Sequence, residues 1–359
     1  MKKILTILGA RPQFIKAAAV SRAFAHSGFR EVILHTGQHF DKNMSDIFFD
    51  QMEIPRPDFM LNINSLGHGA MTGRMLEEIE KVLVKEKPDA LMVYGDTNST
   101  IAGALAAKKL QVRVVHIEAG LRSFNMAMPE EVNRILTDRI SDFLFCPTDT
   151  AIENLHREGY QNIPCHIENV GDVMYDAALY YSQKAENLAE VYPTLGLKTG
   201  EYVLCTVHRQ ENTDNPERLK SIFGALNEIH KQKRVILPLH PRTRKILAQN
   251  GLKLDFEPID PVGYFDIVQL LKNASLVLTD SGGMQKESYF FGKYCITLRD
   301  ETEWVELVTH GFNSLAGSEK QQILDAFNHA LTAPFPKSIP LYGEGNASEK
   351  IIRTLQSKL

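Results

Sequence analysis

The sequence predicts an α/β protein with two Rossmann-like domains, each built on a doubly wound parallel sheet. Short apolar, β-branched runs alternate with amphipathic segments along nearly the whole chain of 359 residues. A chain of this length can fold as two domains with separate cores. Polar residues and glycines follow most of the apolar runs, and in parallel sheets the carboxyl ends of the strands are where ligands bind.

The composition is that of a soluble globular protein, with 43% apolar and 23% charged residues. The net charge of −4 and the lack of a long Lys/Arg run argue against nucleic acid as a partner. No run approaches the ~20 apolar residues of a membrane span, and no signal peptide is expected, so we expect a cytoplasmic protein without a membrane partner. The four scattered cysteines are expected to be reduced and buried, and the histidine spacing predicts no metal site.

The first apolar run, Ile4–Leu8, predicts a strand that is followed by a tight turn and a helix with Pro12 near its start. A helix N-terminus that faces the end of a strand is a natural anion site. Arg11 and Lys16 lie in that turn and in the first turns of the helix, so both are candidates to contact a phosphate or an oxyanion. Alternatively, both are solvated surface charges.

A second strand is predicted at Glu31–Thr36, and Ala90–Tyr94 predicts another buried strand. Asp96 follows the latter strand and is a candidate acid or base. Alternatively, Asp96 or Asn98 caps the helix predicted at Thr100–Leu110. Between these strands, apolar residues recur at helical spacing and are interpreted as core positions: Met71, Met75, Ile79, Val82 and Leu83.

Three acids follow the next predicted strand, Val112–Ile117, within a short stretch of sequence. Glu118, Glu130 and Glu131 are expected near one loop, where a partly desolvated carboxylate can hold a proton near neutral pH. Alternatively, Pro129 with the two acids after it forms a helix N-terminus, where acidic residues suit the helix macrodipole.

The alternation continues to about residue 172 and resumes near residue 201. We therefore predict an N-terminal domain at residues 1–172, with most of the acid/base residues, and a linker region at 173–200, which ends in a polar, irregular patch. A C-terminal Rossmann-like domain is predicted at 201–345, and a helix at 346–359 is predicted to pack back on the N-terminal domain. The first half also contains a strand predicted at Phe143–Cys146, a helix at Thr148–Glu158 and a strand at His166–Val170.

In the second half, strands predicted at Tyr202–Val207 and Arg234–Leu239 end at His208 and His240, respectively. A third strand, at Ser275–Thr279, ends before a glycine pair that precedes a helix. Glycines at a helix N-terminus let backbone N–H groups approach an anion, so a phosphate cradle is expected there, although the segment can also be an ordinary turn. Its residues are Ser281, Gly282 and Gly283.

Glu287 lies one helical turn after the glycine pair. It can accept hydrogen bonds from both hydroxyls of a ribose, as acidic residues do in dinucleotide folds. Tyr264 and Phe265 are candidates to flank a nucleotide base, or they are edge residues of the core.

Six motifs in order resemble those of the non-hydrolysing UDP-N-acetylglucosamine 2-epimerases, and the resemblance extends over nearly the whole chain. The motifs are Gly9–Pro12 with Lys16, Tyr94–Thr97, His116–Arg122, Pro129–Glu131, His208-Arg209 with Glu211-Asn212, and Asp280–Gln285 with Glu287.

The resemblance implies a GT-B-like fold with the active site in the cleft between the domains, a UDP-sugar substrate, no redox cofactor and a homodimer. It implies epimerisation at C2 by anti elimination of UDP to a 2-acetamidoglucal, followed by re-addition. The implied acid/base candidates are Asp96, Glu118 and Glu130. The implied partners of the diphosphate are His208, Arg11, Lys16, and Ser281 with its glycines. The implied partner of the ribose is Glu287, and His240 is a further candidate for substrate binding.

The sequence departs from the usual family text at Phe40, Gln210 and Trp304. The first two changes fall in motifs that form an allosteric UDP-GlcNAc site in some bacterial members, so we expect that activation to be absent. Four segments look more like the subgroup that epimerises UDP-2,3-diacetamido-2,3-dideoxyglucuronate to the mannuronate form, for surface polysaccharide (O-antigen or capsule) precursors. They are Gly9–Lys16, His39–Phe49, Ser123–Met126 and Thr302–Glu306.

The substrate's uronate carboxylate needs a cationic or N–H partner, for which Arg242, Arg244 and Arg299 are candidates. Alternative functions are a UDP-GlcNAc 2-epimerase, a hydrolysing epimerase, a glycosyltransferase of the same architecture and a non-catalytic nucleotide-sugar-binding protein.

Overall fold

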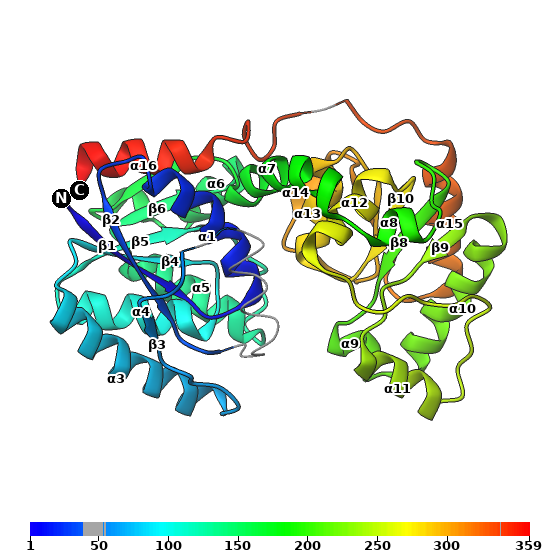
Figure 1. Ribbon diagram of the computed structural model, residues 1–359, viewed down its shortest axis with the longest axis horizontal. Helices are drawn as coiled ribbons and strands as arrows, with labels where there is room; N and C mark the ends of the chain where they lie inside the picture. Colours follow the sequence, from blue (N-terminus) through cyan, green and yellow to red (C-terminus); the bar gives the residue numbers. More distant parts are fainter. Residues whose placement is uncertain (39–52, 54, 338) are drawn as a thin grey trace. The chain divides into compact units, whose positions relative to one another are not determined.

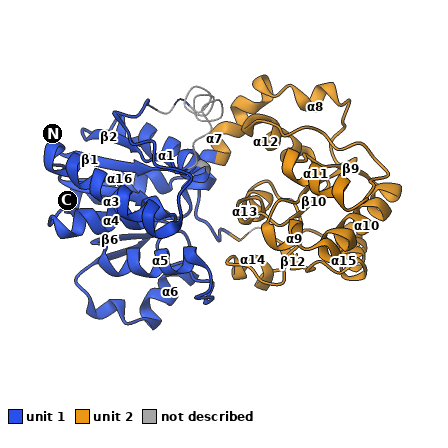
Figure 2. Cartoon of the chain, turned by 90° about the horizontal axis from the view of Figure 1, so that it is seen from below, with its two compact units in different colours: residues 1–177, 340–359 blue, residues 178–339 orange. Residues whose placement is uncertain are grey.

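The computed structural model describes residues 1–38, 53, 55–337 and 339–359. The segment His39–Phe49 that contributed to the subgroup prediction lies outside the described residues, and so does the side chain of Arg11. The chain divides into two compact units (Figure 2). Unit 1 comprises residues 1–177 and 340–359, and unit 2 comprises residues 178–339.

Unit 1 contains a parallel sheet in which seven described strands lie in the order β3-β2-β1-β4-β5-β6-β7 (Figure 1). The strands are mostly buried because helices cover the sheet, which is why they read as apolar runs in the sequence. Their bounds are β1 Lys3–Leu8, β2 Arg30–His35, β3 Phe59–Met60, β4 Ala90–Tyr94, β5 Arg113–Ile117, β6 Phe143–Cys146 and β7 His166–Asn169.

The helices of unit 1 form layers on the sheet. Helices α3, α4 and α5 pack side by side in one layer, and α1 packs against α16 (Figure 1). The five apolar positions predicted for the core of α3 are all buried. The helix bounds are α1 Arg11–Phe24, α3 His68–Glu86, α4 Asn98–Lys109, α5 Pro129–Ile140, α6 Asp149–Arg157, the 3₁₀ helix η1 Tyr160–Asn162, α7 Val173–Leu188, which continues into unit 2, and α16 Ala347–Lys358.

The last helix, α16, belongs to unit 1 although it follows unit 2 in the sequence. Asp176 accepts hydrogen bonds from the backbone N–H groups of Ala347 and Ser348, at 3.0 and 2.7 Å, and so satisfies the first turn of α16. At the other end, Arg113 donates to the carbonyl oxygens of Lys358 and Leu359. The two termini lie close together (Figure 1).

Three neighbouring strands, β1, β4 and β5, lie at or next to a reversal of the strand order in unit 1. β2 and β3 lie on one side of β1, and β4 to β7 lie on the other, so the strand order reverses between β1 and β4. Such a switch point at the carboxyl ends of parallel strands is where open α/β sheets bind ligands. The turns after β4 and β5 hold Asp96 and Glu118 at this edge, and Lys16 lies in α1, which follows the turn after β1.

Unit 2 repeats this scheme with five described strands in the order β12-β11-β10-β8-β9, all parallel. The order reverses between β8 and β10, so the turns that follow these two strands are neighbours. The strand bounds are β8 Tyr202–Thr206, β9 Arg234–Ile236, β10 Leu276–Thr279, β11 Cys295–Thr297 and β12 Asn313–Leu315.

The sheet of unit 2 lies between two layers of helices, and each layer packs on the sheet through its own apolar cluster. One cluster joins α10, α11 and α15 to one face of the sheet, and the other joins α12 and α13 to the opposite face. The helix bounds are α8 Val191–Thr194, α9 Gln210–Thr213, α10 Pro216–Gln232, α11 Pro241–Gln249, α12 Tyr264–Asn273, α13 Gly282–Phe290, α14 Val305–Thr309 and α15 Lys320–Thr332.

The fold class is therefore the predicted one, with differences in detail. β9 ends at Ile236 rather than Leu239, and Pro238 makes only an isolated bridge to Ile259. The patch predicted to be irregular contains the short helix α8. Three cysteines are buried, but Cys165 is partly exposed, contrary to the prediction that all four are buried. Within the described residues, no helix has the length and apolar character needed to span a membrane.

Candidate active site

Asp96 lies directly after β4 and is fixed by Arg134 of α5. The guanidinium donates to one carboxylate oxygen from both Nε and Nη2, at 3.2 and 2.7 Å. Arg134 is buried, whereas the Asp96 side chain is 31% exposed, so solvent or a ligand can reach the carboxylate. Asp96 does not cap α4, because Thr97 is the N-cap and accepts from the backbone of Thr100.

Glu130 and Glu131 occupy the first turn of α5, as the helix reading of this segment predicted. Glu130 is exposed. Glu131 is fully buried and accepts hydrogen bonds from the backbone of Ser123 and Phe124, at 3.0 and 2.9 Å, and from Arg134. Burial alone would raise the pKa of Glu131, but the hydrogen bond from Ser123 and the charge of Arg134 outweigh it and lower the pKa. Glu131 thus has a structural role, and of these two glutamates Glu130 is the exposed one.

Glu118 follows β5 and has a left-handed backbone, with φ of +71°. This conformation is uncommon for a residue other than glycine. Its buried carboxylate forms an ion pair with Lys16 of α1. Both groups lie against Gly95, where an added Cβ would be 3.2 Å from Glu118 Oε2 and 3.5 Å from Lys16 Nζ. The Lys16 ammonium therefore neutralises the charge of the Glu118 carboxylate, a candidate catalytic acid. Lys16 is also the candidate partner of a phosphate, and in that role its charge would serve both groups.

The turn after β5 requires a glycine at position 120. Gly120 has φ of +79°, and a Cβ there would lie 2.5 Å from the carbonyl oxygen of Ala151. The Gly120 backbone N–H donates to Asp138, and its carbonyl accepts from Asn154. These contacts fix the exit of β5 next to Glu118.

Gln13 connects the first turn of α1 to the end of β4. Its side-chain oxygen accepts from the backbone of Gly9 and Ala10, at 2.8 and 3.0 Å. Its amide nitrogen donates to the carbonyl of Tyr94 at 2.8 Å and to Thr97 at 3.0 Å. The segment with Arg11 and Lys16 is thereby fixed beside the segment with Asp96.

In unit 2, the end of β8 is fixed by a buried carboxylate at the end of β10. Asp280 accepts from the backbone of His208 and Arg209, from His208 Nδ1 at 2.8 Å and from the Asn212 amide at 3.1 Å. Burial alone would raise the pKa of Asp280. The hydrogen bond from His208 and the charge of His208 outweigh this effect, and the pKa is lowered. The His208 side chain remains 54% exposed. It is thus oriented by Asp280 and open to a ligand.

The predicted phosphate cradle begins helix α13. Ser281 is the N-cap, and its hydroxyl accepts from the backbone of Met284. The first amides of a helix have no partner within the helix, so those of Gly282 and Gly283 can bind an anion. A Cβ on Gly282 would lie 2.3 Å from Glu303 Oε1, so this glycine also makes room for the Glu303 carboxylate.

Glu287 is buried one turn further along α13, and its Oε1 accepts from the Tyr264 hydroxyl at 3.3 Å. Tyr264 and Phe265 are both buried, which agrees with the core-edge interpretation of these aromatic residues. His240 is exposed and caps its own helix, α11, by accepting from the backbone of Arg242.

Each arginine considered for a uronate carboxylate already has an acidic neighbour. Arg242 contacts Asp214 at 2.7 Å, and Arg244 lies near Glu257 and Asp260; all of these side chains are exposed. Arg299 is buried and contacts Glu303 at 2.9 Å.

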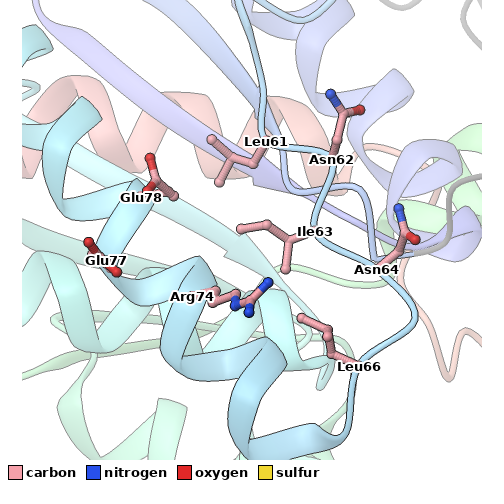
Figure 3. Close-up of a pocket in the computed structure, with 8 residues that line it drawn as sticks. All are labelled: Leu61, Asn62, Ile63, Asn64, Leu66, Arg74, Glu77 and Glu78. Atoms are coloured by element: carbon pink, nitrogen blue, oxygen red, sulfur yellow. The ribbon is translucent and has the colours of Figure 1, made fainter.

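A separate cavity of 420 Å³ lies between α3 and the segment before it (Figure 3). None of the predicted site residues lines it, and the segment that lines it follows the carboxyl end of β3, an edge strand of the sheet. Within the described part of the chain, no cluster of His, Cys, Asp and Glu has the geometry of a metal site. The cavity is lined by Leu61, Asn62, Ile63, Asn64, Leu66, Arg74, Glu77 and Glu78.

Comparison with known proteins identifies the family. The family model described as UDP-N-acetylglucosamine 2-epimerase matches residues 22–356. The chain belongs to this family. As a member, it is a UDP-sugar 2-epimerase, and its two parallel sheets are those of the GT-B-like fold of these enzymes.

Two relatives cover nearly the whole chain. A Pseudomonas aeruginosa protein named UDP-2,3-diacetamido-2,3-dideoxy-D-glucuronate 2-epimerase is 56% identical over 98% of this chain and 99% of its own length. A Methanococcus maripaludis protein named UDP-N-acetylglucosamine 2-epimerase is 45% identical over 98% of each chain.

A solved structure agrees with these relatives. The crystal structure of Methanocaldococcus jannaschii UDP-GlcNAc 2-epimerase in complex with UDP-GlcNAc and UDP matches with a TM-score of 0.90. Its sequence is 44% identical, and the match covers 99% of both chains.

The residues that the sequence did not single out are the partners of the candidate groups. Gln13, Arg134 and Asp138 all contact a turn that holds a candidate residue. Asp280 was given only as part of a motif, without its role as the partner of His208. His116 gave a usable signal, because a polar side chain within an apolar strand must find buried partners.

Proposed function

We propose that the chain interconverts UDP-2,3-diacetamido-2,3-dideoxyglucuronate and its mannuronate epimer at C2. The observation that supports this substrate is the 56% identity to the Pseudomonas aeruginosa enzyme of that name, compared with 45% to the Methanococcus maripaludis UDP-N-acetylglucosamine 2-epimerase. The segments Thr302–Glu306 and Ser123–Met126 support the same substrate, because they resemble those of the diacetamido-glucuronate subgroup.

The proposed reaction proceeds by anti elimination and re-addition. A carboxylate removes the C2 proton, the electron pair forms the C1–C2 double bond, and the C1–O bond breaks with its electrons passing to UDP. The products are a 2-acetamidoglucal and UDP. Re-addition protonates C2 on the other face while a UDP oxygen attacks C1. This route needs proton carriers for both faces and stabilisation of the leaving diphosphate.

In unit 1 we propose Asp96, Glu118 and Glu130 as the proton carriers. Three observations support this: Asp96 is partly exposed, Glu118 lies beside Gly95, and Glu130 is exposed at the start of α5. Lys16 keeps the Glu118 carboxylate from being an isolated buried charge, which would otherwise be costly.

In unit 2 we propose that the UDP moiety binds at the start of α13. Ser281, Gly282 and Gly283 supply a helix N-terminus for the diphosphate. Glu287 accepts from the ribose hydroxyls, and His208, held by Asp280, assists the diphosphate charge together with Arg11 and Lys16. His240 is proposed as a further contact.

The uronate carboxylate needs a cationic partner, and Arg242, Arg244 and Arg299 remain the candidates. A homodimeric state, a cytoplasmic location and a role in making precursors of surface polysaccharides also stay predictions.

The substrate proposal is tested by measuring kcat/KM for both UDP-sugars with the same enzyme preparation. We expect a preference for the diacetamido uronate, and a clear preference for UDP-GlcNAc would assign the enzyme to that substrate instead. The same assay tests regulation, because rates that need added UDP-GlcNAc would contradict the predicted absence of allosteric activation.

A further inference from the structure

His116 is a fully buried histidine in β5, one of the most central strands of unit 1, and both of its ring nitrogens contact hydrogen-bond acceptors. Nε2 lies 2.7 Å from the carbonyl oxygen of Gly95, which follows β4. Nδ1 lies 2.7 Å from Oδ1 of Asp138 on α5. A carbonyl oxygen can only accept, so Nε2 donates to Gly95. The ring therefore connects the turn that contains Asp96 to helix α5.

Asp138 extends this connection to the turn after β5. Its second oxygen, Oδ2, accepts from the Gly120 backbone N–H at 3.1 Å and from Arg122 Nη1 at 2.7 Å. Burial would raise the pKa of Asp138, but the hydrogen bond and charge of His116 and the charge of Arg122 outweigh it and lower the pKa. One ionised carboxylate thus contacts both His116 and the turn that contains Glu118.

Arg122 closes the network at its outer end. It donates to both oxygens of Glu158, from Nε and Nη2, at 2.7 and 2.8 Å. The Arg122 side chain is 1% exposed and Glu158 is 32% exposed, so the network runs from the interior of the sheet to the surface. Each charged group in it has a partner of opposite charge.

Packing does not require these polar residues. His116 lies between the buried residues Val115 and Ile117 and pairs in register with Val93, where an apolar side chain would fit the pattern of the strand. Replacing a buried ion pair by apolar residues of similar volume is often neutral or stabilising. The network therefore needs a reason other than stability, and what it contacts are the turns of two candidate catalytic residues.

We propose that His116 and Asp138 are positioning residues, which hold the Gly95–Asp96 turn and the Glu118–Gly120 turn together so that both carboxylates act on the same sugar carbon. The proposal rests on the epimerase mechanism proposed above. Neither residue is assigned a contact with substrate. A displacement of about 1 Å in a catalytic group can cost about 100-fold in rate, so holding the turns matters for kcat.

Two substitutions of His116 separate its contacts. In His116→Gln the amide can reach the position of Nε2 and keep the hydrogen bond to Gly95. In His116→Asn the amide can replace only Nδ1, so the contact with Asp138 is kept and that with Gly95 is lost. Each substitution therefore breaks the connection between the Gly95 carbonyl and Asp138, at one end or at the other. We expect kcat to fall about 100-fold in both variants, with KM within about threefold of wild type.

The matched control is Asp142→Asn. Asp142 accepts from the Val114 backbone N–H at 2.8 Å at the opposite end of the same strand, and it contacts Lys108. This variant loses a carboxylate that also accepts from a backbone N–H group, although it is 27% exposed and lies far along β5 from the two turns. We expect its kcat to match wild type even if its unfolding temperature falls.

Hydrogen exchange measured by mass spectrometry tests the positioning without requiring activity. We expect faster exchange at residues 93–97 and 118–123 in His116→Asn and Asp138→Asn, and unchanged exchange there in Asp142→Asn. Unchanged exchange at both turns in the first two variants, or wild-type kcat in either His116→Gln or His116→Asn, would overturn the proposal. If the wild type turned over no UDP-sugar, the proposed function would fail, and the exchange data alone would decide the positioning role.

Discussion

Two adjacent glutamates in the first turn of α5 should respond in opposite ways to the same isosteric change. Glu131 is buried and holds a loop, whereas Glu130 is exposed and is proposed to carry a proton. We predict that Glu131→Gln mainly lowers stability and that Glu130→Gln mainly lowers kcat. Because the two positions share a helix turn, each variant is the control for the other.

The magnitude for Glu131→Gln follows from its contacts. The carboxylate accepts from two backbone N–H groups, from the Ser123 hydroxyl and from Arg134, and Phe124 is held with φ of +57°. A glutamine side chain has only one acceptor oxygen, so its NH₂ group would face one of these N–H or O–H donors without forming a hydrogen bond. Breaking a buried charged pair costs about 3–5 kcal/mol. At about 2–4 °C per kcal/mol, the unfolding temperature should fall by at least about 6 °C.

For Glu130→Gln we expect a large change in rate and only a small change in stability. An exposed acid near a helix N-terminus contributes only about 0.3–1 kcal/mol through the macrodipole, so the unfolding temperature should change by no more than about 4 °C. Removing a general acid or base typically costs about 10²–10⁴-fold in rate. The assays are thermal unfolding by circular dichroism and kcat with saturating UDP-sugar. If Glu131→Gln kept wild-type stability, or Glu130→Gln kept wild-type kcat, the assignment of roles would be wrong.

Three further predictions use other residues. The pKa of Asp138 is lowered on folding from its ordinary value of 3.8. Its stabilisation is therefore present above that pH and lost as pH falls through the folded value. Urea unfolding should show that the difference in unfolding free energy between wild type and Asp138→Asn decreases below about pH 4, and a difference that stayed constant there would contradict this. Glu287→Gln should raise the Kd for UDP about 10- to 100-fold by calorimetry, because a hydrogen bond to a charged group contributes about 1.5–3 kcal/mol, and an unchanged Kd would exclude the ribose contact. A thiol reagent should label Cys165 slowly in the native protein, since burial raises the pKa of that thiol, and the three buried cysteines should react only after unfolding, a result that early labelling of any of the three would contradict.

The sequence predicted the turns of the site because strand periodicity and turn residues are local. A buried apolar run followed by glycine and an acid defined the exits of β4 and β5, and the same reading found the start of α13. A doubly wound parallel sheet was inferred from the α/β alternation, but the strand order that makes these exits neighbours was not predicted.

The partners of the site residues could not be predicted in the same way. Arg134 lies 38 residues from Asp96, and Asp138 lies 22 residues from His116, so these contacts depend on how α5 packs on the sheet. The helical reading of Pro129–Glu131 gave the correct element but not which acid is buried. That difference arises from the loop at Ser123 and Phe124, whose backbone N–H groups need an acceptor.

The central claim is that carboxylates of unit 1 exchange the C2 proton of a UDP-sugar during reversible elimination of UDP. The most direct measurement is proton NMR of the UDP-sugar incubated with enzyme in D₂O. The account predicts deuterium at C2 in both epimers with UDP still attached, and loss of that exchange in Asp96→Asn or Glu118→Gln. Epimerisation or UDP release without deuterium at C2 would contradict it.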